Sequence, residues 1–216
     1  MQGDRIPTRI LSVRILPNAD PALLAQLDCI EGERSLGIFT TDSDDVGYAA
    51  LDEATKKAQV RVAYAKSMYA GAANASTRLA GEFIGILAGP SPDQVRSGLD
   101  AIERFIENDA AFYSADDQDS IVYFAHCISR TGDYLSEQAG VPAGTAMAYL
   151  IAPPLEAMVA LDTALKAADV TLRVFYGPPS ETNFAGALLT GEQAACQAAC
   201  EAFAEEVCRV ATEPLG

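Results

Sequence analysis

The sequence repeats itself at an offset of 110 residues, which is close to half of its 216-residue length. Residues 51–60 read LDEATKKAQV and residues 161–170 read LDTALKAADV, with six identities in register. A second pair follows, EFIGIL at 82–87 and NFAGAL at 183–188. The duplication predicts two related domains, residues 1–108 and 109–216, whose similar surfaces favour further assembly.

The charge of the chain restricts its partners. The 15 Lys and Arg residues are outnumbered by 30 Asp and Glu, which gives a net charge of −15. Nucleic acids and anionic membrane surfaces are bound through clustered basic residues, so we expect neither as a partner. A cationic or neutral polar small molecule fits the acidic field better, although acidity that only keeps the protein soluble is an equally good explanation.

The cysteines and the first residues bear on the compartment. The 5 cysteines form no CxxC pair, and an odd number fits a disulfide framework poorly. The first ten residues, MQGDRIPTRI, lack the apolar segment of a secretory signal, and no run approaches the length of a membrane span. We therefore expect a cytosolic protein in a reducing environment.

Strand and helix patterns alternate in the same order in both halves. Branched and apolar runs predict strands at 10–16, 35–40, 60–64 and 82–88, and again at 120–126, 146–152, 170–176 and 184–189. Helices are expected between them, the first opened by Asp20 as a cap and Pro21 as its first residue. The alternation predicts an α/β (α+β) fold with helices packed on a sheet, and leaves the strand directions open.

One segment breaks the symmetry of the halves. Residues 65–81 read AKSMYAGAANASTRLAG, whereas the equivalent 177–182 read only GPPSET. A long connection of small residues is typical of a lid, a binding loop or a mobile flap. The alternative is a plain surface insertion.

The inventory of reactive groups argues against an enzyme. The single histidine, His126, lies in an apolar strand-like run, and its neighbour Cys127 points to the opposite strand face. Nucleotide-binding glycine motifs and the nucleophile motif GxSxG are absent from the sequence. No spacing of His and Cys suits a metal ion. We expect no catalysis, no metal and no cofactor.

Carboxylates are the best polar candidates for a site. Three aspartates crowd residues 42–45 at an expected helix start, where the exposed N–H groups stabilise them. Such capping explains at least one of them, and three exceed what a cap needs. Glu82 precedes the last strand of the same half, and Phe112 and Tyr113 could add cation–π contacts. Together these residues favour an ammonium group over an anion.

Long stretches resemble a known family. They include SLGIFTTDSDDVGYAALDEATKKA, MYAGAANASTRLAGE, AHCISRTGDYLS, AYLIAPPLEAMVALDTALKAADV and PPSETNFAGALLTGEQAACQAAC, and they cover nearly all of the chain after about residue 34. The chain resembles the tandem-domain shell proteins of bacterial microcompartments, in particular the ethanolamine-utilisation EutL family. The resemblance implies two circularly permuted microcompartment (BMC) domains and a pseudohexameric homotrimer that tiles with other shell proteins around metabolic enzymes.

The resemblance also implies roles for individual residues. Asp44, Asp45, Glu82 and Phe112 match positions that line a small acidic pore and bind a ligand. Residues 67–81 and 178–184 match loops that gate a central pore, with Ser67, Met68, Tyr69, Arg78, Asn183 and Phe184 among them. Lys56 and Lys166 match a lysine at the tile edge, although Lys57 follows Lys56, so which lysine of the first half faces the edge stays open.

Two functions remain in view at this stage. The first is a shell tile in the bacterial cytoplasm whose gated pore passes or senses a small cationic metabolite such as ethanolamine. The second is a soluble regulatory module that binds a small amine without shell assembly. An enzyme that uses the acidic residues has little support, because no activated nucleophile accompanies them.

Overall fold

The computed structural model describes residues 1–68, 78–180 and 183–215. Its contacts divide the chain into two compact units. We call Thr8–Ala110 with Gly132–Leu135 the first-half unit, and Met1–Pro7, Ala111–Thr131 and Ser136–Gly216 the second-half unit. These are clusters of contacts, and the domains 1–108 and 109–216 stay a prediction.

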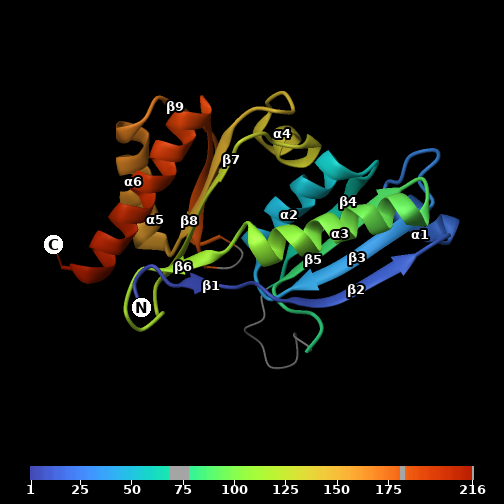
Figure 1. Cartoon of the computed structure of the whole chain (residues 1–216), viewed down its shortest axis with the longest axis horizontal. Helices are drawn as coiled ribbons and strands as arrows, with labels where there is room; N and C mark the ends of the chain where they lie inside the picture. The colour runs from blue at the N-terminus through green and yellow to red at the C-terminus, as the bar shows by residue number, and fades with distance from the viewer. Residues whose placement is uncertain (69–77, 181–182, 216) are drawn as a thin grey trace. The chain divides into compact units, whose positions relative to one another are not determined.

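The first-half unit has an antiparallel sheet with helices on both faces (Figure 1). In sheet order its strands are β2 (Ile10–Leu16), β3 (Ser35–Thr41), β5 (Phe83–Gly89) and β4 (Arg61–Ser67). Helices α2 (Asp44–Lys57) and α3 (Pro92–Asn108) cover one face, and the short α1 (Pro21–Gln26) lies against the other. Strand residues alternate between the two faces, so Leu36 contacts the α1 side while Phe39 packs on the α2 side.

The second-half unit repeats this plan and adds two short strands. Its sheet runs β1 (Arg5–Ile6), β6 (Phe112–Ser114), β7 (Val122–Ile128), β8 (Met147–Ala152), β10 (Ala185–Gly191) and β9 (Val170–Tyr176). Helices α5 (Pro154–Ala167) and α6 (Gln193–Thr212) pack on it around the buried Phe203, and α4 (Asp133–Ala139) follows β7. The first turn of α4 is counted with the first-half unit.

The two sheets confirm the duplication and the α+β class. The strand order β2-β3-β5-β4 of the first half recurs as β7-β8-β10-β9 in the second. Every strand pairing that the structure gives is antiparallel, which settles the direction that the sequence left open. In the part of the chain that is described, no helix combines the length and apolar character of a membrane span.

Several elements begin and end where the sequence predicts. The strands at 10–16 and 170–176 have the expected bounds, and α1 is capped by Asp20, whose carboxylate accepts from the Ala22 N–H at 2.8 Å. The other predicted strands differ from the observed bounds by one or two residues at an end, and β4 differs most. It continues to Ser67, so the first residues of the expected loop 65–81 belong to the sheet. Backbone pairing with β5 extends the strand there, although Lys66 and Ser67 lack strand-like side chains.

Candidate functional site

The first turn of α2 carries two buried carboxylates in the first-half unit. Asp44 and Asp45 are 6% and 5% exposed. The Ser67 hydroxyl, at the end of β4, donates to Asp44 Oδ2 at 2.8 Å, and the Tyr48 hydroxyl lies 3.0 Å from the same Ser67 oxygen. The positive end of the helix dipole and this hydroxyl pair stabilise carboxylates that burial would otherwise penalise.

Close packing between α2 and β5 brings the helix start near Glu82. A Cβ atom at Gly47 would come within 2.5 Å of the buried Phe83 ring, so a glycine is required for this approach. The Tyr48 ring meets the same Phe83 ring edge-on, with centroids 4.7 Å apart. Glu82 immediately precedes Phe83, which places it at the border of the acidic residues.

Two backbone hydrogen bonds fix the position of Glu82, and nearby aspartates affect the pKa of its carboxyl. Its N–H donates to the Thr41 carbonyl at 2.9 Å, and its own carbonyl accepts from the Met68 N–H at 2.7 Å. Partial desolvation raises the pKa of the Glu82 carboxyl, and the charges of Asp44 and Asp42 raise it further. Glu82 is nevertheless exposed, so a ligand can reach it from solvent.

The third aspartate of the helix start has a basic partner. Arg9 Nε lies 2.8 Å from Asp42 Oδ2, and the Arg9 N–H donates to Asp42 Oδ1 at 2.7 Å. Ser43 lies between Asp42 and the first residue of α2. Its buried hydroxyl has no hydrogen-bond partner among the described residues. Arg9 thus offsets part of the charge of Asp42, while the charges of Asp44 and Asp42 both still act on Glu82.

Such an arrangement concentrates carboxylates at the start of α2. The acidic neighbours also act on Tyr48: burial raises the pKa of its phenol, and the charges of Asp44 and Asp45 add to the rise. A neutral phenol can donate or accept a hydrogen bond beside an ammonium group. Within the described ranges, no group of three or more His, Cys, Asp or Glu side chains is placed to hold a metal ion.

Phe112 belongs to a different part of the molecule from the three acids. It lies in β6 of the second-half unit, with its ring centroid 5.4 Å from that of Phe124 and 6.0 Å from that of Phe184. The structure therefore brings Phe112 together with Phe184, a residue of the shorter predicted gating loop. The role of Phe112 at the ligand site stays a prediction.

The predicted gating residues fall in several kinds of structure. Ser67 is the last residue of β4, and Arg78 is exposed in a turn. Asn183 has a left-handed backbone with φ +67° and donates its N–H to the Ser180 carbonyl at 3.1 Å. Tyr69 lies outside the described residues.

The two predicted edge lysines differ in exposure. The Lys56 side chain is 24% exposed and lies 2.5 Å from Glu53, whereas Lys166 is 73% exposed and lies 2.5 Å from Asp162. The following residue of the first half, Lys57, is 59% exposed. Of the two adjacent lysines in the first half, Lys57 thus has the more exposed side chain.

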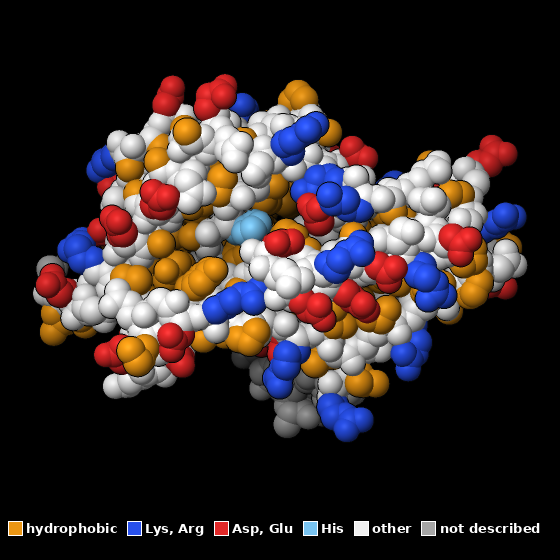
Figure 2. All heavy atoms as spheres, viewed as in Figure 1, with side chains coloured by type: hydrophobic (Ala, Val, Ile, Leu, Met, Phe, Trp, Pro, Cys, Tyr) orange, Lys and Arg blue, Asp and Glu red, His pale blue; other side chains and the backbone are white. Residues whose placement is uncertain are grey.

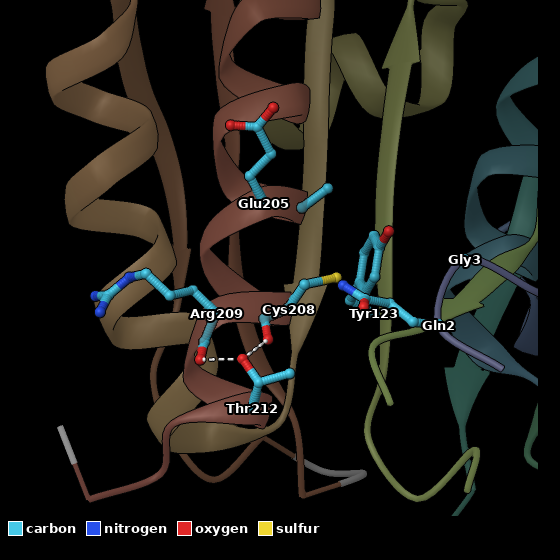
Figure 3. A pocket seen from close by; sticks show the side chains of 8 residues that line it. Gln2, Gly3, Tyr123, Glu205, Cys208, Arg209 and Thr212 are labelled. Carbon is cyan, nitrogen blue, oxygen red and sulfur yellow. Dashed lines mark hydrogen bonds between the residues drawn. The ribbon is translucent and has the colours of Figure 1, made fainter. Parts of the chain in front are cut away.

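A separate concavity of about 480 Å³ lies on the second-half unit between the start of the chain, β7 and the end of α6. Figure 3 shows Cys208 pointing toward Tyr123 while Arg209 points away from it. Burial, with Cys208 nearby, raises the pKa of Tyr123 to about 12. Arg209 pairs with Glu206 instead of facing the concavity. None of the predicted site residues lines this surface.

Charges elsewhere are mixed. Figure 2 shows acidic and basic side chains interspersed over the face it presents. The acidic residues at the start of α2 are therefore distinguished by their proximity and burial, and the overall charge of the chain alone would not single them out.

Comparison with known proteins decides the family. The family model described as "BMC domain" matches residues 35–115 and 152–214. The bacterial microcompartment shell protein EutL of Clostridium perfringens is 61% identical over 216 residues, covering 100% of both chains, and that of Salmonella typhimurium is 49% identical over 212 residues, covering 98% of this chain and 97% of its own. The chain belongs to the EutL family of bacterial microcompartment shell proteins.

Solved structures agree with this assignment. The crystal structure of the ethanolamine utilization protein EutL from Leptotrichia buccalis is 65% identical, covers 100% of both chains and superimposes with a TM-score of 0.97. The trimeric shell protein PduB, at 19% identity, shares the fold with a TM-score of 0.78 over 94% of this chain and 89% of its own. The chain is thus a structural shell protein and not an enzyme, as predicted, and the module without shell assembly is not supported.

Two contributors to the acidic site were not predicted. Ser67 was assigned to a gating loop and Tyr48 was not considered. Tyr48 lies four residues after Asp44 on the same helix face, which was a usable signal. Ser67 reaches the helix only through the pairing of β4 with β5, which the sequence pattern did not reveal.

Proposed function

We propose that three copies of this shell protein form a flat tile, and that the acidic residues of the first-half unit bind a small cationic amine such as ethanolamine. The observation that carries this proposal is the burial of Asp44 and Asp45 in the first turn of α2, with Glu82 nearby: partial desolvation raises the pKa of the Glu82 carboxyl, and the charges of Asp44 and Asp42 raise it further. The positive charge of an ammonium group offsets the charges of the carboxylates, and its N–H groups can donate hydrogen bonds to them. The relative from Leptotrichia buccalis, at 65% identity, is an ethanolamine utilization protein, which supports the choice of amine.

The affinity should be modest. A shell pore has to release what it binds, so we expect a dissociation constant between roughly micromolar and millimolar. Glu82 and Tyr48 are partly accessible, which keeps the local dielectric high and weakens each charge interaction.

Titration calorimetry with ethanolammonium chloride tests the site. The variants Glu82→Gln and Asp45→Asn should each weaken binding by about tenfold or more, since each removes one charge next to the ammonium group. The control is Asp162→Asn, which removes the same charge from an exposed position in the second-half unit. Equal affinity in all four proteins would refute the assignment.

We also propose that the segment between β4 and β5 gates a central pore of the trimer. Its two ends are joined by the hydrogen bond from Met68 N–H to the Glu82 carbonyl, so a ligand at Glu82 touches the base of the segment. The ligand shifts the gate only if it binds the two states with different affinity. Amide exchange at Met68 and Arg78 should change when ethanolammonium is added; strand-like protection that the ligand leaves unaltered would contradict the gate.

The tile edge and the location complete the proposal. Lys56 and Lys166 are proposed to lie at the lateral edges of the tile, where a long side chain can rest against a neighbouring shell protein. The assembled shell is proposed to stand in the bacterial cytoplasm, enclosing enzymes that consume the amine.

A further inference from the structure

Two hydroxyl groups connect the buried Asp44 carboxylate to a partly exposed tyrosine in the first-half unit. The Ser67 hydroxyl lies 2.8 Å from Asp44 Oδ2, and the Tyr48 hydroxyl lies 3.0 Å from the Ser67 oxygen. Asp44 is 6% exposed, whereas Tyr48 is only partly buried. We call Tyr48, Ser67 and Asp44 the hydroxyl relay.

A count of protons fixes the direction of both hydrogen bonds in the relay. A carboxylate only accepts, so the one hydroxyl proton of Ser67 is donated to Asp44. The Ser67 oxygen can then only accept from Tyr48, and the phenol therefore donates its proton to Ser67. Because the Tyr48 oxygen has no second proton, it can act only as an acceptor toward any further group.

The surroundings of Tyr48 keep this acceptor protonated and in place. Burial raises the pKa of the Tyr48 phenol, and the charges of Asp44 and Asp45 raise it further, so the phenol stays neutral at neutral pH. The Tyr48 ring meets the Phe83 ring edge-on with centroids 4.7 Å apart, and it stacks on the Tyr134 ring at 6.4 Å. A ring packed against two others loses little further freedom when a ligand binds, which favours recognition.

The second half of the internal repeat has no such relay. At the offset of 110 residues, the equivalents of its members in chain order are Pro154, Met158 and Gly177. None of these side chains has a hydroxyl or a carboxylate. The relay therefore occurs only in the half that also carries the buried carboxylates at the start of its helix.

We propose that Tyr48 is a specificity-determining residue of the amine site, and that its oxygen accepts an N–H of the bound ammonium group. The inference rests on the proposed function and adds a chemical class to it: amines that keep at least one N–H bind in preference to quaternary ammonium ions. The carboxylates attract both classes through the positive charge, which methyl groups do not remove. Only an ion with an N–H can use the acceptor at Tyr48.

Ser67 acts through Tyr48 and is therefore a positioning residue. While its own proton is donated to Asp44, Ser67 accepts the phenol proton and keeps it away from the ligand. Without the Ser67 hydroxyl, the phenol proton can turn toward the ammonium group, where two donors would face each other. The place of Ser67 is set by the pairing of β4 with β5, in which it lies opposite Phe83.

Titration calorimetry with three amines of equal charge tests the role of Tyr48. The chlorides of ethanolammonium, dimethylethanolammonium and trimethylethanolammonium (choline) share a hydroxyl group and carry three, one and no N–H. Tyr48→Phe removes the acceptor and keeps the ring, so it should weaken binding of the first two by about fivefold to tenfold, as expected for one hydrogen bond to a charged group, and leave binding of choline unchanged. The matched control, Tyr64→Phe, removes the hydroxyl of a tyrosine in β4 that is 41% exposed, and it should bind all three amines as the wild type does.

Two variants of Ser67 separate positioning from a general effect on the fold. Ser67→Ala should reduce the preference for ethanolammonium over choline in the same direction as Tyr48→Phe. Ser67→Thr keeps a hydroxyl and should restore the preference. A purely structural role would change the affinities for all three amines together.

The outcomes separate this inference from the amine site itself. Equal weakening of all three amines in Tyr48→Phe, or no weakening of any, would overturn the role of Tyr48. The amine site would still stand if Glu82→Gln weakened ethanolammonium binding in the same experiment. A wild type that binds none of the three amines would overturn both.

Discussion

Helices α2 and α5 share one repeated sequence and differ in how far their repeated aspartates are buried. Both carry Leu-Asp followed by Lys four residues after the Asp, yet Asp52 is 0% exposed and accepts two backbone N–H groups, while the Asp162 side chain is 64% exposed and meets only Lys166 among the described contacts. The difference does not arise within the helices. It comes from residues 132–135, which lie on α2 and have no counterpart on α5 within one chain.

The helix starts differ as well, and here the sequence itself changed. The first turn of α2 holds Asp44 and Asp45, whereas α5 opens with Pro154 and Leu155 at the equivalent positions. Only the first half therefore offers carboxylates at this helix start, and it is the half to which we assign the proposed cationic ligand.

The largest effect on stability is expected at Gly186, the equivalent of Gly85. A Cβ atom at Gly186 would lie 1.9 Å from the Leu150 carbonyl oxygen, and backbone cannot move aside cheaply. At Gly85 the nearest atom belongs to the Phe39 ring, at 2.4 Å. Gly186→Ala should lower the free energy of unfolding by about 3 kcal/mol or more and Gly85→Ala by roughly 1–2 kcal/mol, measured by urea denaturation. A larger loss of stability in Gly85→Ala than in Gly186→Ala would contradict this ranking of the two close contacts.

The next largest difference in stability is expected between Asn substitutions at the repeated aspartates Asp52 and Asp162. Asp52→Asn replaces one of two buried acceptors by an N–H donor facing another donor, so unfolding should become easier by about 1–3 kcal/mol. Asp162→Asn should change the free energy of unfolding of the isolated chain by less than about 0.5 kcal/mol. Thermal or urea unfolding of both variants, compared with that of the wild type, measures this; equal losses would contradict the difference in burial.

Acid should weaken amine binding in the first half. The raised pKa of Glu82 means that its charge is lost at a higher pH than that of an ordinary glutamate, whose value is 4.5. Because the ammonium group binds the charged carboxylate, affinity should be full above the raised pKa and fall as the pH drops through it, with proton release on binding at that pH. Calorimetry in buffers of different ionisation enthalpy detects those protons, and a pH profile identical in Glu82→Gln would contradict the assignment.

The smallest effect on folding is expected at the edge lysines. Lys166 forms an exposed pair with Asp162, and such pairs contribute roughly 0.3–0.5 kcal/mol. Lys166→Glu should therefore leave the protein folded while extended layers disappear in negative-stain micrographs. Lys56 lies 3.5 Å from the buried Asp52 carboxylate, so the first-half edge is tested with the uncharged Lys56→Gln, which adds no negative charge there. Layers as extensive as those of the wild type would rule out the edge role.

The fold was more predictable from the sequence than the site. Runs of branched and apolar residues located β2 and β9 at their observed bounds, because each is a strand-forming segment of ordinary length. The strands β1 and β6 span only two and three residues and exist through pairing with each other and with β7, so no local pattern announces them.

The sequence predicted which acidic residues are candidates, but it did not predict their hydrogen-bond partners or their burial. Three aspartates at a helix start and a glutamate before a strand were visible in sequence, whereas the hydroxyl of Ser67 beside Asp44 depends on strand pairing. The burial of Asp52 was equally hidden, since its donors lie about 80 residues further along the chain. Contacts between distant segments, rather than composition, thus decide which carboxylates are available to a ligand.

A crystal structure of the protein grown with millimolar ethanolammonium tests the central claim most directly. The account predicts one amine per chain, with its nitrogen within hydrogen-bonding distance of the carboxylates of Glu82 and Asp45 or Asp44, and no amine beside Pro154 and Leu155 at the equivalent place in the second half. An amine bound at that second place, or electron density for no amine in the first half at a saturating concentration, would contradict the assignment of the ligand to the first half.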